Sequence, residues 1–306
     1  MVIANPIYDV VFKRMMEDEK VAKFFISTLL DETVDTIEVK PQEFTFTKEL
    51  PALAIFRLDF IATIKTANGS YKKILIEIQK AKNFIDLMRF RNYLGEQYKK
   101  VDIINNEKVA LPITTIYILG FKLPEIETAC LKVERTYQDL TNKKSLPIRC
   151  DFVEKLTHDS FIVQVDRITS RYQSRLDKLL SIFEQTNFVD DQKIIKEYFH
   201  ELDIDELKIA TDILHHAGTN PKEKKEIENE QEAWRTVYAL SGDLREKLDN
   251  QYKAISQMNI ALSEKDEALV KKEEALVEKN EALVKKDQIL DNLQKEIEDL
   301  KRQLGK

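Results

Sequence analysis

The stretch that decides the fold is Phe56-Arg57-Leu58-Asp59-Phe60-Ile61-Ala62-Thr63-Ile64, followed by Asn68-Gly69 and then by Lys73-Ile74-Leu75-Ile76-Glu77-Ile78-Gln79-Lys80. Apolar residues alternate with others in both halves, which is the period of a strand with one buried face. Asn-Gly between two such halves is a strong signal for a hairpin turn. The sequence therefore predicts two antiparallel strands that carry Asp59, Glu77 and Gln79 on the same polar face.

The length of the turn decides which residues face each other across this hairpin. A two-residue loop would set the apolar face of one strand against the polar face of the other. A three-residue loop, Ala67-Asn68-Gly69 with the glycine in the left-handed conformation, keeps the apolar faces together. We therefore expect Phe60 opposite Ile76, and Asp59 opposite Glu77 with Cβ atoms about 4.5 to 5.5 Å apart. Two carboxylates at that separation repel each other unless a cation or a proton lies between them.

An Asp on one strand and a Glu-x-Gln on the next resemble the motif of the PD-(D/E)XK nucleases, in the variant where Gln replaces the motif Lys. Two further segments, Lys80-Ala81-Lys82 and Arg89-Phe90-Arg91-Asn92-Tyr93-Leu94, are similar to the branch of nuclease-family transposases, or recombination-promoting nucleases. The resemblance covers roughly residues 5–185. The alternative is an ordinary half-buried hairpin whose wet face carries solvated polar residues.

The resemblance implies a restriction-endonuclease-like α-β-β-β-α-β core with additional helices. It also implies Mg²⁺ as the cofactor, with Mn²⁺ as a substitute, and DNA as the substrate. Asp59 and Glu77 would bind the metal, with the backbone carbonyl of Ile78 as a further oxygen ligand. Gln79 would orient the attacking water or a phosphate oxygen. Lys80 cannot replace the missing motif Lys, because on a regular strand it points to the other face.

Basic residues are concentrated around this hairpin, with nine lysines and arginines against three acids between residues 65 and 100. In the family, the helix after the hairpin faces the site, which makes DNA-contact candidates of Lys80, Lys82, Arg89, Arg91 and Tyr93. A solvated charged surface is the alternative. Asp9, on an opening helix expected over 8–31, is a possible accessory acid, or else a charge favoured by the helix dipole.

Periodicity predicts the other elements of the globular part. We expect a strand over 43–48, a helix from an Asn83 N-cap to about Val101, and a strand over 111–120 that is buried on both faces at the sheet centre. The buried stripe of that helix is expected to be Leu87, Phe90, Leu94, Tyr98 and Val101. Strands with a short turn are expected over 131–139 and 147–168, then helices over 171–183 and 190–216. His158 is interpreted as a capping or surface group.

Composition places limits on the whole chain. A net charge of −6 argues weakly against indiscriminate binding to nucleic acid. The N-terminus lacks a charged-then-apolar leader and no apolar run reaches about 18 residues, so we expect a cytoplasmic protein with no membrane contact. Cys130 and Cys150 lack metal-ligand spacing and are interpreted as ordinary buried or half-buried thiols. The expected domains are 1–185 for the nuclease-like part, 186–221 for a helical extension and linker, and 222–306 for a charged heptad-repeat helix.

The C-terminal segment repeats Glu-Ala-Leu-Val at seven-residue intervals. Taken as position a of a heptad, the repeating apolar residues are Leu262, Leu269, Leu276, Leu283, Leu290, Ile297 and Leu304. Position d then holds four lysines, at 265, 272, 279 and 286, before Leu293 and Leu300. We expect residues 225–304 to form a homodimeric coiled coil that is weak in its middle. A lone charged helix is the alternative.

These observations favour a metal-dependent DNA endonuclease, a hydrolase of phosphodiester bonds, linked to DNA mobility, recombination or defence against foreign DNA. The alternative is a catalytically weak or inactive nuclease-fold protein that binds DNA or assembles partners through its coiled coil. A purely structural scaffold explains only the C-terminal segment.

Overall fold

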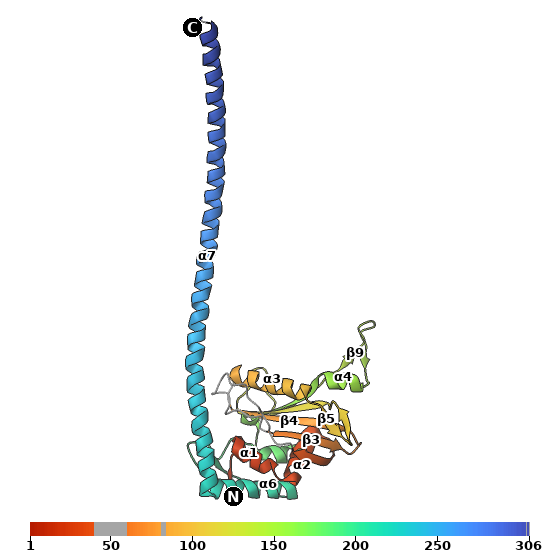
Figure 1. Ribbon diagram of the computed structural model, residues 1–306. Helices are drawn as coiled ribbons and strands as arrows, with labels where there is room; N and C mark the ends of the chain where they lie inside the picture. The colour runs from red at the N-terminus through yellow and green to blue at the C-terminus, as the bar shows by residue number, and fades with distance from the viewer. Residues whose placement is uncertain (40–59, 81–83, 304, 306) are drawn as a thin grey trace. The chain divides into compact units, whose positions relative to one another are not determined.

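The computed structural model describes residues 1–39, 60–80, 84–303 and 305 (Figure 1). The chain divides into two compact units, Met1–Ala233 and Trp234–Lys306. Residues 186–221, expected to form an extension and linker, lie inside the first unit. None of the described helices is long and apolar enough to cross a membrane.

The first unit is built on a six-stranded mixed sheet with the order β2-β3-β4-β7-β11-β8. These strands are β2 (Val34–Val39), β3 (Phe60–Thr66), β4 (Tyr71–Gln79), β7 (Ile113–Leu119), β11 (His158–Gln164) and β8 (Cys130–Val133). The central strand β7 is parallel to both β4 and β11, while the outer pairs are antiparallel. The expected central strand is thus confirmed. The strand expected over 43–48 lies outside the described residues.

The β3–β4 hairpin has the expected register, with Phe60 opposite Ile76. The loop is the three-residue one, because Thr66 N–H donates to the carbonyl of Ser70 at 2.9 Å. Gly69 has φ +85°, which a residue with a Cβ rarely adopts. Asp59 lies outside the described residues, one position beyond the last pair of the ladder, so its pairing with Glu77 stays a prediction.

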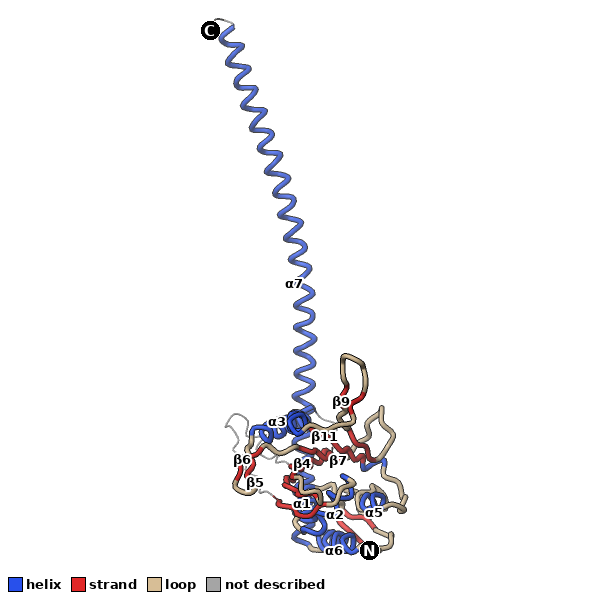
Figure 2. The backbone as a smooth tube through the Cα atoms, turned by 90° about the vertical axis from the view of Figure 1, so that its right-hand side faces the viewer, coloured by secondary structure: helices blue, strands red, loops and turns tan. Residues whose placement is uncertain are grey.

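Helices cover both faces of the sheet (Figure 2). One face packs on α1 (Asp9–Met16), α2 (Glu19–Leu30), α5 (Arg175–Ser181) and α6 (Asp205–Thr219), and the other lies under α3 (Phe84–Lys99). The single helix expected over 8–31 is wrong. It is interrupted at Asp18, whose carboxylate accepts hydrogen bonds from the backbone N–H of Lys20 and Val21 and so caps a second helix.

The buried face of α3 differs from the expected stripe. Phe90 and Tyr93 are buried against the sheet and Gln97 is 3% exposed, whereas Leu87, Tyr98 and Val101 are exposed. The helix therefore turns a partly polar row toward the sheet. The apolar stripe failed as a guide because the sheet face under α3 is itself polar, as the site geometry below shows.

The helix expected over 190–216 is only half right. Its first part contains β12 (Ile195–Glu197), which pairs with β1 (Val2–Ala4), and α6 ends at Thr219, three residues beyond the expected end. A Cβ on Gly218 would lie 3.0 Å from the backbone nitrogen of Ala4. The glycine therefore permits close packing of α6 on β1 in the last turn of the helix.

Smaller elements complete the first unit. They are the β5 (Asp102–Ile104) and β6 (Glu107–Val109) hairpin, the β9 (Tyr137–Gln138) and β10 (Ser145–Leu146) hairpin, α4 (Asp151–Leu156) and a 3₁₀ turn over Val165–Arg167. The helix α4 falls where strands and a turn were expected. The helix expected over 171–183 is shorter and begins at Arg175, where Ser174 and Asp177 form a capping box.

The last element is α7 (Pro221–Gln303), a single helix. Its described position-a residues from Leu262 to Ile297 are 51–63% exposed. The coiled coil itself stays a prediction.

Lys196 makes the stability of the first unit depend on pH. Its ammonium is 2% exposed and donates to the carbonyl of Glu184 at 2.5 Å, and burial lowers its pKa to about 7. Because the unfolded chain binds this proton up to about pH 10, stability should rise with pH above 7. We expect the parent to gain about 2 kcal/mol between pH 7 and 9 relative to Lys196→Met, as measured by urea unfolding at both pH values. Equal pH dependence of the two proteins would contradict this.

Candidate functional site

Strand β4 sorts its side chains onto the two faces of the sheet. Ile76 and Ile78 enter the core with α1 and α2, while Leu75 packs with residues of α3. Glu77 and Gln79 have the same alternation as Leu75 and therefore lie on the α3 face. Glu77 is 0% exposed and Gln79 is 8% exposed. Among the described residues, no hydrogen-bond partner is found for the Gln79 Nε2.

Tyr117 lies next to Glu77, because the parallel β4–β7 ladder pairs these two residues. The Tyr117 ring packs on Phe90 of α3, with ring centroids 4.5 Å apart. Burial raises the pKa of Tyr117 to about 12, opposed by a hydrogen bond with Thr115 and reinforced by the Glu77 charge. A protonated phenol therefore lies beside the Glu77 carboxylate at neutral pH.

Hydroxyl groups extend the set of polar side chains formed by Gln79, Glu77 and Tyr117 across the sheet. The Thr115 and Ser160 hydroxyls are 2.7 Å apart, and the Tyr98 hydroxyl lies 2.9 Å from the Nδ1 of His158. Burial lowers the pKa of His158 below its ordinary value, and the Arg135 charge lowers it further. We call this set the polar row, with members Gln79, Glu77, Tyr117, Thr115, Ser160 and His158. Nearly all residues over 111–120 are β-branched or apolar, so no sequence pattern marked Thr115 and Tyr117 as site residues.

A buried ion pair lies on the same face, two alternations before Glu77. The Lys73 ammonium is 2.8 Å from the Asp102 carboxylate, and the two side chains are 2% and 6% exposed. A buried pair of this kind fixes a position more than it adds stability, because both charges lose their water. The face under α3 is thus polar along much of β4.

Lys80 lies on the other face, as its place in the strand predicted. Its ammonium is 4.2 Å from the centroid of the Tyr8 ring and forms an ion pair with Glu230 of α7. The Lys80 side chain is 17% exposed. The prediction that Lys80 contacts DNA is therefore wrong, because this cation is already engaged inside the fold.

Glu230 also binds the start of α1. Its two carboxylate oxygens accept hydrogen bonds from the backbone N–H of Asp9 and of Val10, both at 3.0 Å. The N-cap residue of α1, Tyr8, offers no side-chain cap, so Glu230 supplies it from α7. The Asp9 carboxylate pairs with Lys13 at 2.6 Å. An accessory role of Asp9 in catalysis stays a prediction.

The remaining site candidates have separate outcomes. Arg91 is exposed on α3 and free to meet a ligand from solvent. Tyr93 is 5% exposed and packs with Phe90 and Leu75, so the prediction that it contacts DNA is wrong. Asp59 and Lys82 lie outside the described residues, and so does the side chain of Arg89.

Of the two cysteines, Cys130 is half-buried as expected, whereas Cys150 is exposed, so its expected burial is wrong. Both cysteines are free, and burial raises the pKa of the Cys130 thiol to about 11.

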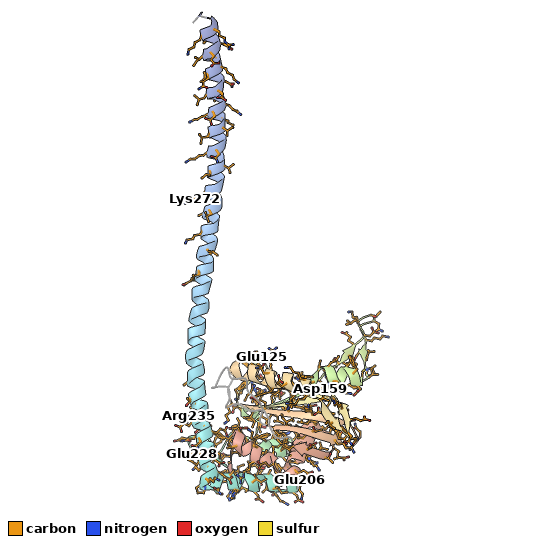
Figure 3. All side chains as sticks on the ribbon, in the orientation of Figure 1. Glu125, Asp159, Glu206, Glu228, Arg235 and Lys272 are labelled. Carbon is orange, nitrogen blue, oxygen red and sulfur yellow. The ribbon has the colours of Figure 1, made fainter. Side chains whose placement is uncertain are left out.

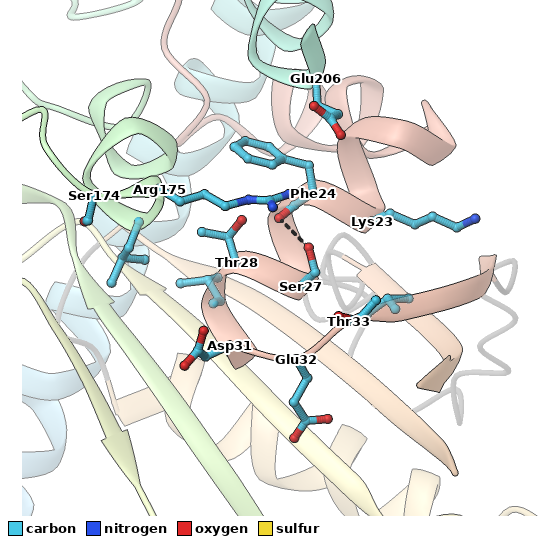
Figure 4. Close-up of a pocket in the computed structure, with 13 residues that line it drawn as sticks. Lys23, Phe24, Ser27, Thr28, Asp31, Glu32, Thr33, Ser174, Arg175 and Glu206 are labelled. Atoms are coloured by element: carbon cyan, nitrogen blue, oxygen red, sulfur yellow. Dashed lines mark hydrogen bonds between the residues drawn. The ribbon is translucent and has the colours of Figure 1, made fainter. Parts of the chain in front are cut away.

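A groove of about 670 Å³ on the other side of the sheet is lined by α2 and the starts of α5 and α6 (Figure 4). There Arg175 lies over the Phe24 ring at 5.1 Å, and lysine, arginine and carboxylate side chains are mixed.

Comparisons with family models, with curated proteins and with solved structures find no match. In the part of the chain that the structure describes, no group of three or more His, Cys, Asp or Glu residues could hold a metal ion. The expected metal site includes Asp59, which is not in that part. The functional argument therefore rests on the residues of this chain.

The first turns of α7 are expected to be needed for the first unit to fold. Ile227 is 1% exposed, and Glu230 caps α1, so a truncation after Asn220 should destabilise the unit by about 3 to 5 kcal/mol relative to a truncation after Ala233. Urea unfolding of the two truncations measures this difference. Glu230→Ala should show part of the loss, whereas Glu226→Ala, at an exposed position on the same helix, should not. Equal stability of the truncations would contradict the packing role of this segment.

Proposed function

We propose that this protein is a metal-dependent DNA endonuclease of the PD-(D/E)XK type. The observation that carries the proposal is the fully buried Glu77 carboxylate beside Gln79, near the carboxyl end of β4 and under α3. The order α1-α2-β2-β3-β4-α3-β7, with β4 next to β7, is compatible with the restriction-endonuclease-like core that the resemblance implies. The β3–β4 ladder from Lys65 to Phe60, continued by one residue, would put Asp59 opposite Glu77.

The donor set suits Mg²⁺. The Asp59 and Glu77 carboxylates and the Ile78 carbonyl are hard oxygen ligands, which Mg²⁺ and Mn²⁺ prefer. When bound, such a metal lowers the pKa of a water molecule and neutralises charge on the scissile phosphate. A cation there would also offset the cost of keeping Glu77 ionised without contact with solvent.

The protein's own groups would then position the substrate. The Gln79 amide can donate a hydrogen bond to a water or a phosphate oxygen, which is a weaker interaction than the ammonium of the motif Lys would provide. The Tyr117 phenol, held against Phe90, is a second neutral donor beside Glu77. Lys80 cannot supply the missing charge, because it is paired with Glu230 on the opposite face.

Cleavage of plasmid DNA in Mg²⁺ tests the assignment. We expect Glu77→Gln and Asp59→Ala to lower the rate by a factor of about 100 or more, because each removes a carboxylate from the metal site. Gln79→Lys should retain or raise the rate, since it restores the charge found in most of the superfamily. Glu184→Gln is the matched control, because Glu184 is also buried but lies away from the polar row.

Two other results of the cleavage experiment would contradict this assignment. If both carboxylate variants cut as fast as the parent, the site is not catalytic. If the parent binds DNA but does not cut it, the chain is the catalytically inactive DNA-binding or assembly protein that the Gln79 exchange also allows.

We further propose that α7 forms a homodimer over residues 225–304. The exposed row from Leu262 to Ile297 is a seven-residue seam that a second copy can cover, although the lysines at 265, 272, 279 and 286 must extend their ammonium groups out of it. Such a dimer would bring together two sites that each cut one DNA strand. Two such cuts on opposite strands would give a double-strand break.

Sedimentation of the full chain and of a truncation after Ala233 tests the seam. We expect a dimer for the full chain at micromolar concentration and a monomer for the truncation. Lys272→Leu with Lys279→Leu should tighten the dimer by completing two d positions. Equal monomeric masses would remove the coiled coil, and a truncation that still dimerises would move the interface into the first unit.

A further inference from the structure

Residues 134–157 form a small projection outside the sheet, which we call the arm. It contains β9, β10 and α4, and it rises on the same side of the sheet as α3 (Figures 1 and 2). None of the residues of α4 is buried, and both residues of β10 are exposed. The arm therefore has no core of its own and must be held by polar contacts.

Those contacts are concentrated on Arg135 at the root of the arm. Its guanidinium donates to Asp159 at 2.8 Å and to Glu154 at 2.6 Å, and it also binds the carbonyls of Glu154 and Thr157. The Tyr137 hydroxyl donates to the other oxygen of Glu154 at 2.5 Å. Figure 3 labels Asp159 at this root. A forked, charge-assisted set of bonds of this kind fixes an orientation firmly.

Hydrogen bonds within the tip of the arm also order it. They are accepted by Asp139, the only acidic residue of the tip. Asp139 accepts hydrogen bonds from Thr141 N–H at 2.8 Å and from the Asn142 amide at 2.7 Å. Lys143 and Lys144 follow, both exposed, and no ion pair involving either is found among the described residues. The firmly mounted tip thus presents two adjacent exposed cations against the single carboxylate of Asp139.

Large apolar side chains are also exposed along the arm, at Leu140 (73%), Ile148 (60%), Phe152 (70%) and Leu156 (59%). Exposure of this extent on a segment without a core indicates a surface that meets another molecule. Two exposed lysines against one carboxylate favour an anionic partner at the tip. A two-stranded ribbon can enter a groove of duplex DNA, and lysines beside it can bind the phosphates.

We propose that the tip of the arm binds the backbone of duplex DNA lying across the α3 face of the sheet. The choice of DNA rests on the proposed nuclease function. The arm and the polar row are on the same side of the sheet, and the arm leaves the sheet at the start of β11, the opposite end from Gln79. A duplex over α3 would therefore extend from the arm toward the Gln79 end of β4, while Glu77 itself lies beneath α3.

The test is the affinity of the full chain for a labelled duplex, measured by fluorescence anisotropy without divalent metal between 50 and 200 mM NaCl. Each lost phosphate contact lowers the slope of log K against log salt by about 0.9. We expect the double variant Lys143→Gln/Lys144→Gln to lower the slope by roughly 1.8 and the affinity at 100 mM salt by at least about 10-fold. The control is Lys20→Gln/Lys208→Gln, two exposed lysines on α2 and α6, which cover the other face of the sheet.

The outcomes separate the two proposals. A lower slope in the arm variant supports the arm contact whether or not the parent cuts DNA. A parent that binds and cuts, with an arm variant that keeps the parent's slope and affinity, overturns the arm contact and leaves the nuclease standing. A parent that fails to bind any duplex removes both.

Discussion

The register of the β3–β4 hairpin is the constraint on which the rest of the site depends. Gly69, with its positive φ, closes a loop of three residues, and that length keeps Phe60 opposite Ile76. A slip by one residue would exchange the two faces of β4 and turn Glu77 into the core of α1 and α2. The parallel β4–β7 ladder, a separate pairing, sets Glu77 beside Tyr117. Gly69 thus contributes to the register that puts Glu77 and Gln79 on the α3 face of the sheet.

Burying polar groups on the α3 face of the sheet costs free energy. That cost is the best physical argument that this face has a function. A protein that needed only stability would fill the space under α3 with apolar side chains, as it fills the other side with phenylalanine, methionine and isoleucine. Instead Glu77, Lys73, Gln79, Thr115 and Gln97 are all buried there. Buried polar groups lose their hydration and must find partners within the fold. Perturbed and buried groups gathered in one place are typical of functional sites, although structural networks also produce them.

The sequence was sufficient where a pattern had a single physical cause. Strict alternation and Asn-Gly predicted the hairpin and its register, and a run of β-branched residues predicted a central strand. Prediction from the sequence failed where a residue type can have two structural roles. Asp18 caps a helix in the middle of an apolar period that looked continuous. The sequence could not identify Tyr117 and Thr115 as site residues, because only the pairing of β7 with β4 places them near Glu77. Contacts between residues as distant as Lys80 and Glu230 leave no local pattern at all.

The junction between the globular unit and α7 shows why the C-terminal helix is more than an attached stalk. Glu223 binds both Arg14 and His216, Ile227 is buried, and Glu230 joins the start of α1 to Lys80, the residue directly after Gln79. A carboxylate shared between a helix N-terminus and a lysine holds both in place only while α7 keeps its first turns in position. The end of the strand that carries Glu77 and Gln79 is therefore fixed from the same helix that continues into the leucine repeats. The leucine repeats of α7 are therefore covalently continuous with the segment that holds the end of the strand carrying Glu77 and Gln79.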